Sequence, residues 1–193
     1  MSEIQLINEL TETDRIFLKP TCKLKAKELS DFHIRNREFL KKFIPTHDEA
    51  FFTEKYWEET LQADLEDEKK DRSYHFYIYC KECQDELIGY IGVNGIIRRA
   101  FQSCFIGYQM DKAWINNGYM TEAVGKVTEI AFGRLGLHRI EANIMPWNTR
   151  SLRVVQKNGF VNEGIARDYL LINGKWEDHI HMVKLNPEWK QLI

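Results

Sequence analysis

Residues 106–169, IGYQMDKAWINNGYMTEAVGKVTEIAFGRLGLHRIEANIMPWNTRSLRVVQKNGFVNEGIARDY, decide the fold of this chain. Their apolar spacing predicts strand, turn, helix, strand, helix and strand in that order. The first helix is expected to begin near Gly118-Tyr119 and to be closed by Gly136, where a left-handed cap is favoured. Its unpaired backbone N–H groups and its dipole can hold a phosphate or pyrophosphate. Most glycines before helices are only turn residues, so this is a first suggestion and not yet a site.

The remaining elements complete one α/β domain with a mixed sheet. Strands are predicted at 15–19, 73–80, 86–97, 103–110, 137–145, 160–172 and 176–185. Further helices are predicted at 26–39, 53–69 and 148–158. Asn173-Gly174 is a good turn signal for a hairpin between the last two strands. With no linker or repeat in the sequence, we expect residues 1–193 to form a single domain.

Composition excludes several classes of protein. The chain is 44% hydrophobic and 29% charged, and its formal net charge is -2. This balance offers no basic face for direct contact with nucleic acid. No apolar run approaches the roughly 20 residues of a membrane span, and the N-terminus lacks the plan of a signal peptide. We therefore expect a cytoplasmic protein with no membrane partner.

Three groups of residues invite a second function. Cys80 and Cys83 have the spacing of a zinc or redox pair, but no second pair follows and their flanks predict a hairpin turn, so a structural role is favoured. His179 and His181 share one face of a predicted strand, yet no third ligand is evident and no metal is predicted. The charged run 64–71 is either a solvated helix end or a surface for a basic substrate.

A series of motifs resembles, in order, the GNAT acetyltransferases, and most closely the RimJ/RimL group, which acetylates protein N-termini. The motifs are residues 114–123, 135–141, 148–151, 158–160, 163–164, 167–169 and 173–179, with a fainter match at Asn36, Arg37, Leu40 and Pro45. The resemblance implies a GNAT fold, which is a mixed, mostly antiparallel central sheet of about seven strands flanked by about four helices. It also implies an acetyl-CoA-dependent N-acetyltransferase, in a family where homodimers are common.

The resemblance places acetyl-CoA, as cosubstrate, against the turn before the first helix of this stretch. The residues expected to bind it are Tyr108, Gln109, Met110, Ile115, Asn116, Asn117, Gly118, Tyr119, Met120, Thr121, Asn148 and Ser151. The family turn usually has Gln or Arg first and Gly or Ala last, whereas Ile115 and Met120 stand there and only Gly118 keeps the pattern. Because backbone N–H groups bind the phosphate, this departure is tolerated if Met120 does not crowd it.

The strand at 103–110 and the helix at 148–158 are expected to supply further contacts. A backbone N–H of 108–110 is expected to polarise the thioester carbonyl, in the slot that family members open between this strand and 137–145. Arg150, Arg153 and Lys157 either reach the 3′-phosphate of CoA or form a solvated helix face.

Three catalytic residues are implied. Glu163 matches the glutamate that acts as general base in RimL-like enzymes, and the alternative is an exposed strand residue. Val155 stands where many family members have a tyrosine acid, and that tyrosine is absent. Ser151 matches the serine that is proposed to protonate the leaving thiolate in RimL-like enzymes, and the alternative is that it only hydrogen-bonds its own backbone. Tyr169 is a second candidate acid or a wall of the acceptor pocket.

The acceptor is the least constrained part of the prediction. An α-amino group has a pKa of about 7.7–8.0 and a lysine amine one of about 10.4, so an N-terminus needs less help to lose its proton. A protein N-terminal α-amine, on a ribosomal protein as the resemblance suggests, is the leading acceptor. The alternatives are a small-molecule amine (aminoglycoside, polyamine or amino acid) and a module that binds acyl-CoA without turnover.

Overall fold

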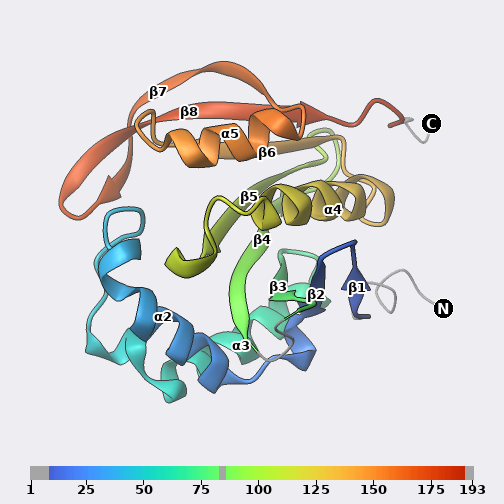
Figure 1. Ribbon diagram of the computed structural model, residues 1–193. Coiled ribbons are helices and arrows are strands. Elements are labelled where there is room, and N and C mark those ends of the chain that lie inside the picture. The colour runs from blue at the N-terminus through green and yellow to red at the C-terminus, as the bar shows by residue number, and fades with distance from the viewer. Residues whose placement is uncertain (1–8, 83–85, 190–193) are drawn as a thin grey trace.

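The computed structural model describes residues 9–82 and 86–189 and consists of one sheet with helices on both faces (Figure 1). The strands are β1 (Thr11–Glu12), β2 (Ile16–Pro20), β3 (Tyr74–Cys80), β4 (Leu87–Ile97), β5 (Ser103–Met110), β6 (Arg139–Ile144), β7 (Val161–Ile172) and β8 (Lys175–Leu185). The α-helices are α2 (Ala26–Leu40), α3 (Glu54–Lys69), α4 (Tyr119–Gly133) and α5 (Thr149–Lys157). Short 3-10 turns are η1 (Thr21–Lys23), η2 (Glu49–Phe52) and η3 (Lys112–Trp114).

The sheet has eight strands in the order β1-β2-β3-β4-β5-β6-β8-β7. All neighbours are antiparallel except β5 and β6, which are parallel. The seven predicted strands are present, and the additional one is the two-residue β1, which pairs with β2. It is too short to leave an alternating pattern that a sequence reading could detect.

The helix boundaries follow the predicted capping residues. Thr53 precedes α3, and its hydroxyl accepts a hydrogen bond from the Tyr56 backbone N–H. Asn148 precedes α5, and its side-chain oxygen accepts from the Ser151 N–H. Each cap satisfies one of the backbone donors that the first helical turn leaves unpaired. Gly118 precedes α4 in the left-handed region, with φ of 84°, and has no side chain to cap the helix.

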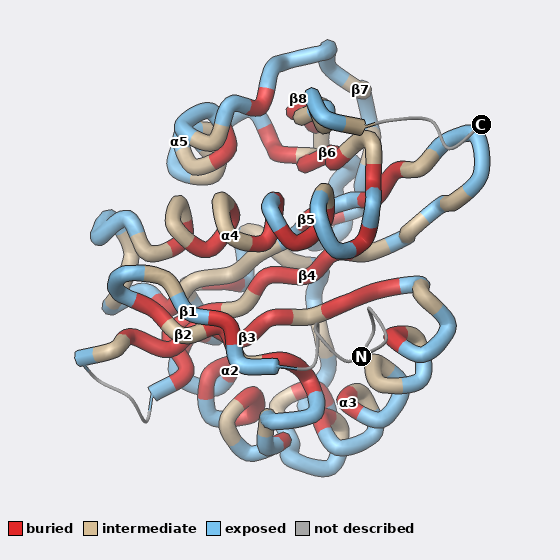
Figure 2. Tube along the Cα trace, turned by 90° about the vertical axis from the view of Figure 1, so that its right-hand side faces the viewer, coloured by how far each residue is buried: buried red, intermediate tan, exposed pale blue. Residues whose placement is uncertain are grey.

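Two apolar cores hold the helices against the sheet. On one face α4 buries Ala123, Val127 and Ala131 completely against the strands. On the other face α2 and α3 bury Phe32 and Trp57. Figure 2 shows α4 on one side of the central strands and α2 and α3 on the other. The sheet is thus buried on both faces over its central strands.

The charged tail of α3 is only partly solvated. Glu68 is buried and accepts a hydrogen bond from the Thr21 hydroxyl. Asp71 pairs with the Arg98 guanidinium at 2.5 Å. Burial raises the pKa of Asp64, and the His75 ring beside it acts in the opposite direction. Part of the predicted charge run therefore ties α3 to the sheet.

The parallel pair β5 and β6 separates along its length. Ladder pairs join Ser103 to Arg139, Cys104 to Ile140 and Phe105 to Glu141, and these described strands share none beyond them. The residues that follow, 106–110 and 142–144, diverge and form what we call the split. A Cβ placed on Gly107 would meet nothing within 4 Å, so the split is open at that point.

Two other predictions concern the cysteine pair and the lack of a membrane span. Cys80 is a buried free thiol at the end of β3, whereas Cys83 lies outside the described residues. None of the helices within 9–82 and 86–189 is long and apolar enough to cross a membrane.

Candidate functional site

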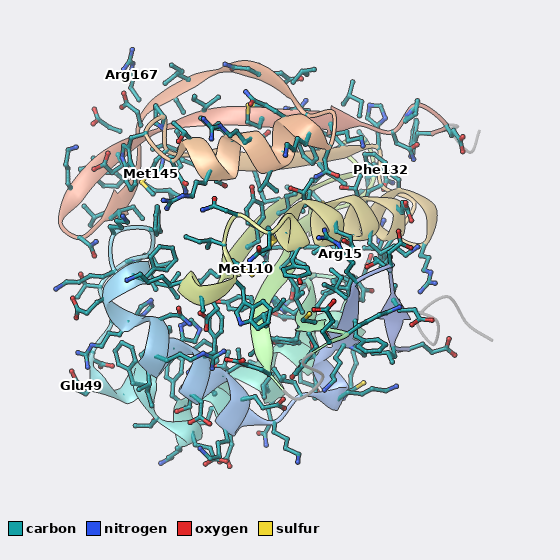
Figure 3. All side chains as sticks on the ribbon, in the orientation of Figure 1. Arg15, Glu49, Met110, Phe132, Met145 and Arg167 are labelled. Atoms are coloured by element: carbon teal, nitrogen blue, oxygen red, sulfur yellow. The ribbon has the colours of Figure 1, made fainter. Side chains whose placement is uncertain are left out.

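A cleft of about 670 Å³ passes through the split and opens on both faces of the sheet. On the face that carries α4 and α5, which we call the α4 side, it is lined by Tyr108, Met110, Ile115, Asn116, Gly118, Tyr119, Met120, Thr121, Asn148, Arg150, Ser151, Arg153 and Lys157. On the opposite face, the α2 side, it is lined by Phe39, Leu40, Phe43, Ile44, Tyr90, Gln109, Asn143, Leu170, Leu171 and His179. Met110 and Met145 both line the cleft, and Figure 3 labels Met110 near the centre of the view and Met145 toward the β7–β8 hairpin.

The turn before α4 presents backbone donors to the cleft. Because Gly118 cannot cap the helix with a side chain, the first-turn N–H groups remain for a ligand. Met120 does not crowd this position, since its side chain is 7% exposed and packs in the core beneath α4. The turn therefore fits a phosphate group despite its departures from the family pattern.

Arg15 holds this turn from outside the cleft. Its Nε donates to Glu122 of α4 at 2.8 Å, and its Nη1 donates to the carbonyl oxygen of Asn117 at 2.9 Å. The guanidinium also lies 4.8 Å from the ring centre of Tyr119. Figure 3 shows Arg15 beside α4. The Asn117 side chain folds back onto the carbonyl groups of the turn, so Asn117 does not line the cleft.

Tyr108 and Ser151 form a pair of hydroxyl groups across the α4 side. Ser151 Oγ donates to the Tyr108 hydroxyl at 2.8 Å, and that hydroxyl donates to the Ser151 carbonyl at 3.0 Å. Burial raises the pKa of Tyr108, and the hydrogen bond from Ser151 lowers it by a smaller amount. Val155, where the family tyrosine was sought, is completely buried in the core. A tyrosine hydroxyl thus reaches this side from β5 and not from α5.

Cations gather at the outer end of the α4 side. Arg150, Arg153 and Lys157 of α5 line the cleft and are exposed, so both predicted alternatives, contact to a phosphate and a solvated helix face, stay open. With the uncapped turn before α4, they give this side two places suited to phosphate groups.

The α2 side carries a polar cluster on β6, β7 and β8. His179 is 3% exposed and lines the cleft. Its Nδ1 lies 3.0 Å from the carbonyl oxygen of Glu177, which makes Nδ1 the donor and leaves the lone pair on Nε2. The ring of Tyr169 packs behind it at 5.3 Å, and the Tyr169 hydroxyl accepts from Asn143 Nδ2 at 2.9 Å.

Glu163 lies outside the cleft and is paired with an arginine. Both its oxygens accept from Arg139, at 3.0 and 2.6 Å, and its side chain is 41% exposed. The hydrogen bond from Arg139 is the main reason that the pKa of Glu163 lies below its ordinary value. Glu163 is not among the described residues that line the cleft. Arg139 also donates to Glu141, whose other oxygen lies 2.9 Å from His181 Nδ1.

An apolar wall lines part of the α2 side. Phe39, Phe43, Leu170 and Leu171 line it, and the β7–β8 hairpin reaches the loop after α2 (Figure 1). At the hairpin turn Asn173 donates to the Lys41 carbonyl and accepts from the Thr46 hydroxyl. The two segments, far apart in the sequence, are therefore tied together over the cleft.

The structure brings most of the predicted site residues together. The predicted cofactor residues line the cleft apart from Asn117, although the side chain of Gln109 lies on the α2 side. Of the predicted catalytic residues Ser151 lines it, whereas Glu163 and Tyr169 do not.

Reasoning from the sequence did not identify Arg15, the hydroxyl group of Tyr108 or the free lone pair on Nε2 of His179 as parts of the site. The strand alternation of His179 and His181 was a usable signal for the last of these. For Arg15 there was none, because its partners lie about a hundred residues away in the chain.

Comparison with known proteins identifies the family. Residues 15–161 match the model of the acetyltransferase (GNAT) domain. The chain is 42% identical over 176 residues to the probable N-acetyltransferase YjcK of Bacillus subtilis, covering 91% of this chain and 97% of that protein. It superposes on the crystal structure of ribosomal-protein-S5-alanine acetyltransferase from Vibrio fischeri with a TM-score of 0.87, at 32% identity, over 94% of this chain and 99% of the other. Mycobacterium smegmatis RimJ, in complex with CoA-disulfide, gives a TM-score of 0.83 at 25% identity, over 91% and 84%. The chain belongs to the GNAT family and is an N-acetyltransferase similar to the RimJ/RimL group.

Proposed function

We propose that this enzyme, in the cytoplasm, transfers the acetyl group of acetyl-CoA to the N-terminal α-amine of a protein, with a ribosomal protein as the leading acceptor. The observation that carries the proposal is the cleft through the split, with phosphate-binding features on its α4 side and a buried imidazole on its α2 side. The names of the S5-alanine acetyltransferase and RimJ neighbours support this class of acceptor.

Acetyl-CoA would lie along the α4 side. The N–H groups of the first turn of α4 would hold the pyrophosphate, and Arg150, Arg153 and Lys157 the 3′-phosphate. The thioester supplies an activated acetyl carbon at the split. A backbone N–H of Tyr108–Met110, freed from pairing with β6, would stabilise the negative charge that develops on its carbonyl oxygen. The CoA complex of the RimJ neighbour supports this placement of the cosubstrate.

His179 is our candidate for the group that accepts the proton of the amine. Its Nε2 carries the free lone pair, and His179 is one of the residues that line the α2 side. A general base works best when its pKa is near the operating pH. The pairing with Arg139 holds the pKa of Glu163 below its ordinary value, which makes this carboxylate a weaker base. Glu163 as base remains a prediction from the family resemblance, and the geometry favours His179.

Tyr108 and Ser151 are our candidates for the proton donor to the leaving thiolate. The Tyr108 phenol is protonated at neutral pH and lines the cleft, so it can donate, and the Ser151 hydroxyl is placed to replace that proton. Tyr169 contacts His179 and would act on the acceptor side through that ring.

Thiol release from acetyl-CoA against a panel of acceptors tests the function. The panel holds peptides that begin with Ala, Ser and Met, the same peptides blocked at the N-terminus but containing lysine, a polyamine and an aminoglycoside. Turnover confined to free N-termini is the expected result. Turnover confined to small amines would overturn the proposed acceptor. CoA binding without turnover of any member of the panel would overturn the proposed acetyl transfer to these amines.

Two matched substitutions identify the base. His179→Gln removes the lone pair of Nε2, and we expect kcat to fall by about 10²- to 10⁴-fold, with acetyl-CoA binding retained. Glu163→Gln keeps the shape of its side chain and should leave kcat within a few-fold of the parent. The reverse ranking would return the role of base to Glu163.

A further inference from the structure

Gly107 of β5 is a glycine that the fold itself does not require. Of the eleven glycines, six have a positive φ, and at three more an added Cβ would lie 2.6–3.0 Å from a neighbouring atom. The other two are Gly107 and Gly133. A Cβ on Gly107 would meet no atom of the described residues within 4 Å, and the φ of Gly107 is not positive. A glycine inside a strand costs stability, and it often marks a place where a ligand approaches closely.

The space above Gly107 belongs to the α2 side of the cleft. Gly107 is exposed and lines the cleft. Its register partner is Gly92 of β4, two residues from Tyr90, whose ring packs against the core formed with α2 and α3. Since side chains alternate along a strand, position 107 faces the α2 side, whereas the next residue, Tyr108, faces the α4 side and meets Ser151. A group that lies over Gly107 therefore comes from the acceptor and not from acetyl-CoA.

Side chains of β3, β4 and β5 bound this space, which we call the recess: they are His75, Asn94, Phe105 and Gln109. Toward β4, His75 and Asn94 lie over Gly92, where an added Cβ would meet Asn94 Nδ2 at 2.7 Å and His75 Cδ2 at 2.8 Å. His75 Nε2 is 3.1 Å from Asn94 Oδ1, which holds the two side chains together. The recess thus ends about one strand spacing, roughly 4.8 Å, from Gly107.

The recess faces the candidate base across the split. Continuing the β5–β6 ladder past its last pair would set Gly107 opposite Asn143 of β6. The β8 partner of Asn143 is two residues from His179 and on the same face of the sheet. An amine that lies in the split between the thioester and His179 has the recess beside its α-carbon, so one substituent of that carbon can enter it.

We propose that the recess receives the side chain of the acceptor's N-terminal residue, and that Gly107 sets how large this side chain can be. The inference rests on the proposed function, because it takes an α-amine as the attacking group. The side chain of Ala or Ser fits a space one strand spacing deep, whereas that of Leu or Phe is longer than this space. Ala should be preferred to Gly in kcat/KM by about tenfold, the lower end of what one methyl group gives in a closed pocket, because the recess is open to the cleft.

Two substitutions fill the recess from the side of the protein. Gly107→Ala adds one carbon atom and Gly107→Val adds three, and a strand accommodates both residues. Peptides that differ only in a first residue of Gly, Ala or Leu are compared by kcat/KM. The ratio of Ala to Gly should fall from about tenfold in the parent to near one in Gly107→Ala and below one in Gly107→Val. In the parent Leu should be a poorer first residue than Ala, and equal values would overturn the size limit.

The ratio separates the recess from a general loss of activity, because a Gly-initiated peptide has no side chain that the added carbon atoms could displace. Gly133→Ala is the matched control and should show the ratio of the parent, since Gly133 is exposed at the end of α4 and is not among the described residues that line the cleft. Gly107→Ala should also raise Tm by roughly 1–4 °C. A lower Tm would show that the space above Gly107 is not free and would overturn the inference.

Peptide binding gives a readout that is separate from turnover. Calorimetry with the CoA-bound protein should show tighter binding of the Ala peptide than of the Gly peptide in the parent, and this difference should disappear in Gly107→Ala. The same difference in the parent and in both Gly107 variants would overturn the inference, as would a parent that does not distinguish the two peptides. If the parent acetylates only small amines, the proposed acceptor fails, and the comparison of glycinamide with alaninamide then decides the inference on its own.

Discussion

Replacing Gly118 by alanine tests whether the backbone of the turn before α4 is the phosphate-binding device. Gly118 has φ of 84°, a region that costs an L-residue about 1–2 kcal/mol. The added Cβ would lie 3.2 Å from Arg15 Nη2, the end of a flexible side chain, so the contact itself adds little. Alanine also reduces the entropy of the unfolded chain, which returns about 0.4–1 kcal/mol. The net cost is therefore about 1 kcal/mol.

That cost must appear in one of two measurements. If the turn keeps its shape, the free energy of unfolding falls, and for a chain of this length Tm should fall by roughly 2–4 °C. If the turn relaxes to a negative φ, acetyl-CoA binding must restore it, and the acetyl-CoA KM should rise by about five- to tenfold with the peptide KM unchanged. Differential scanning calorimetry and steady-state kinetics measure the two effects.

Gly133→Ala is the control on the same helix. Gly133 is the last residue of α4, its φ is not positive, and an added Cβ would meet nothing within 4 Å. The same substitution should therefore stabilise the protein by about 0.4–1 kcal/mol. A Gly118→Ala protein with unchanged Tm and unchanged acetyl-CoA KM, or one that is stabilised as Gly133→Ala is, would refute the reasoning.

Three further predictions concern other parts of the chain. Arg15→Lys cannot donate to Glu122 and to the Asn117 carbonyl at once, and it should raise the acetyl-CoA Kd about three- to tenfold by calorimetry, with Tm nearly unchanged; an unchanged Kd would show that Arg15 does not support the turn. Tyr108→Phe should lower kcat by about 10²-fold or more while acetyl-CoA binding persists, and wild-type turnover would exclude the Tyr108–Ser151 pair as proton donor. His33 is buried, and burial lowers its pKa to about 3, so below pH 6.5 the unfolded chain takes up a proton that the folded chain does not. Its contribution to the free energy of unfolding should then fall by about 1.4 kcal/mol per pH unit between pH 6.5 and 5, and His33→Phe should remove that slope in urea titrations.

The sequence by itself determined the order and type of the elements from β3 to β8. It did so because local signals, such as the Thr53 and Asn148 caps, the Asn173-Gly174 turn and the glycine before α4, act within a few residues of the structure they specify. The residues of the turn and of β5 that line the α4 side follow from the same local signals. Backbone features that are specified by a few neighbouring residues can therefore be predicted from the sequence.

Only the tertiary structure decided which side chains meet at the cleft. The separation of β5 from β6 beyond Phe105 depends on strands whose paired residues are 36 positions apart in the chain, and no local pattern encodes it. Glu163 as base remains a prediction from the sequence, and only the structure shows that Arg139 on another strand pairs with it. Conversely, His179 became a candidate base because a backbone carbonyl fixes its proton on Nδ1. Reactivity depends on the partners that burial brings to a group, and these partners are set by packing between distant segments.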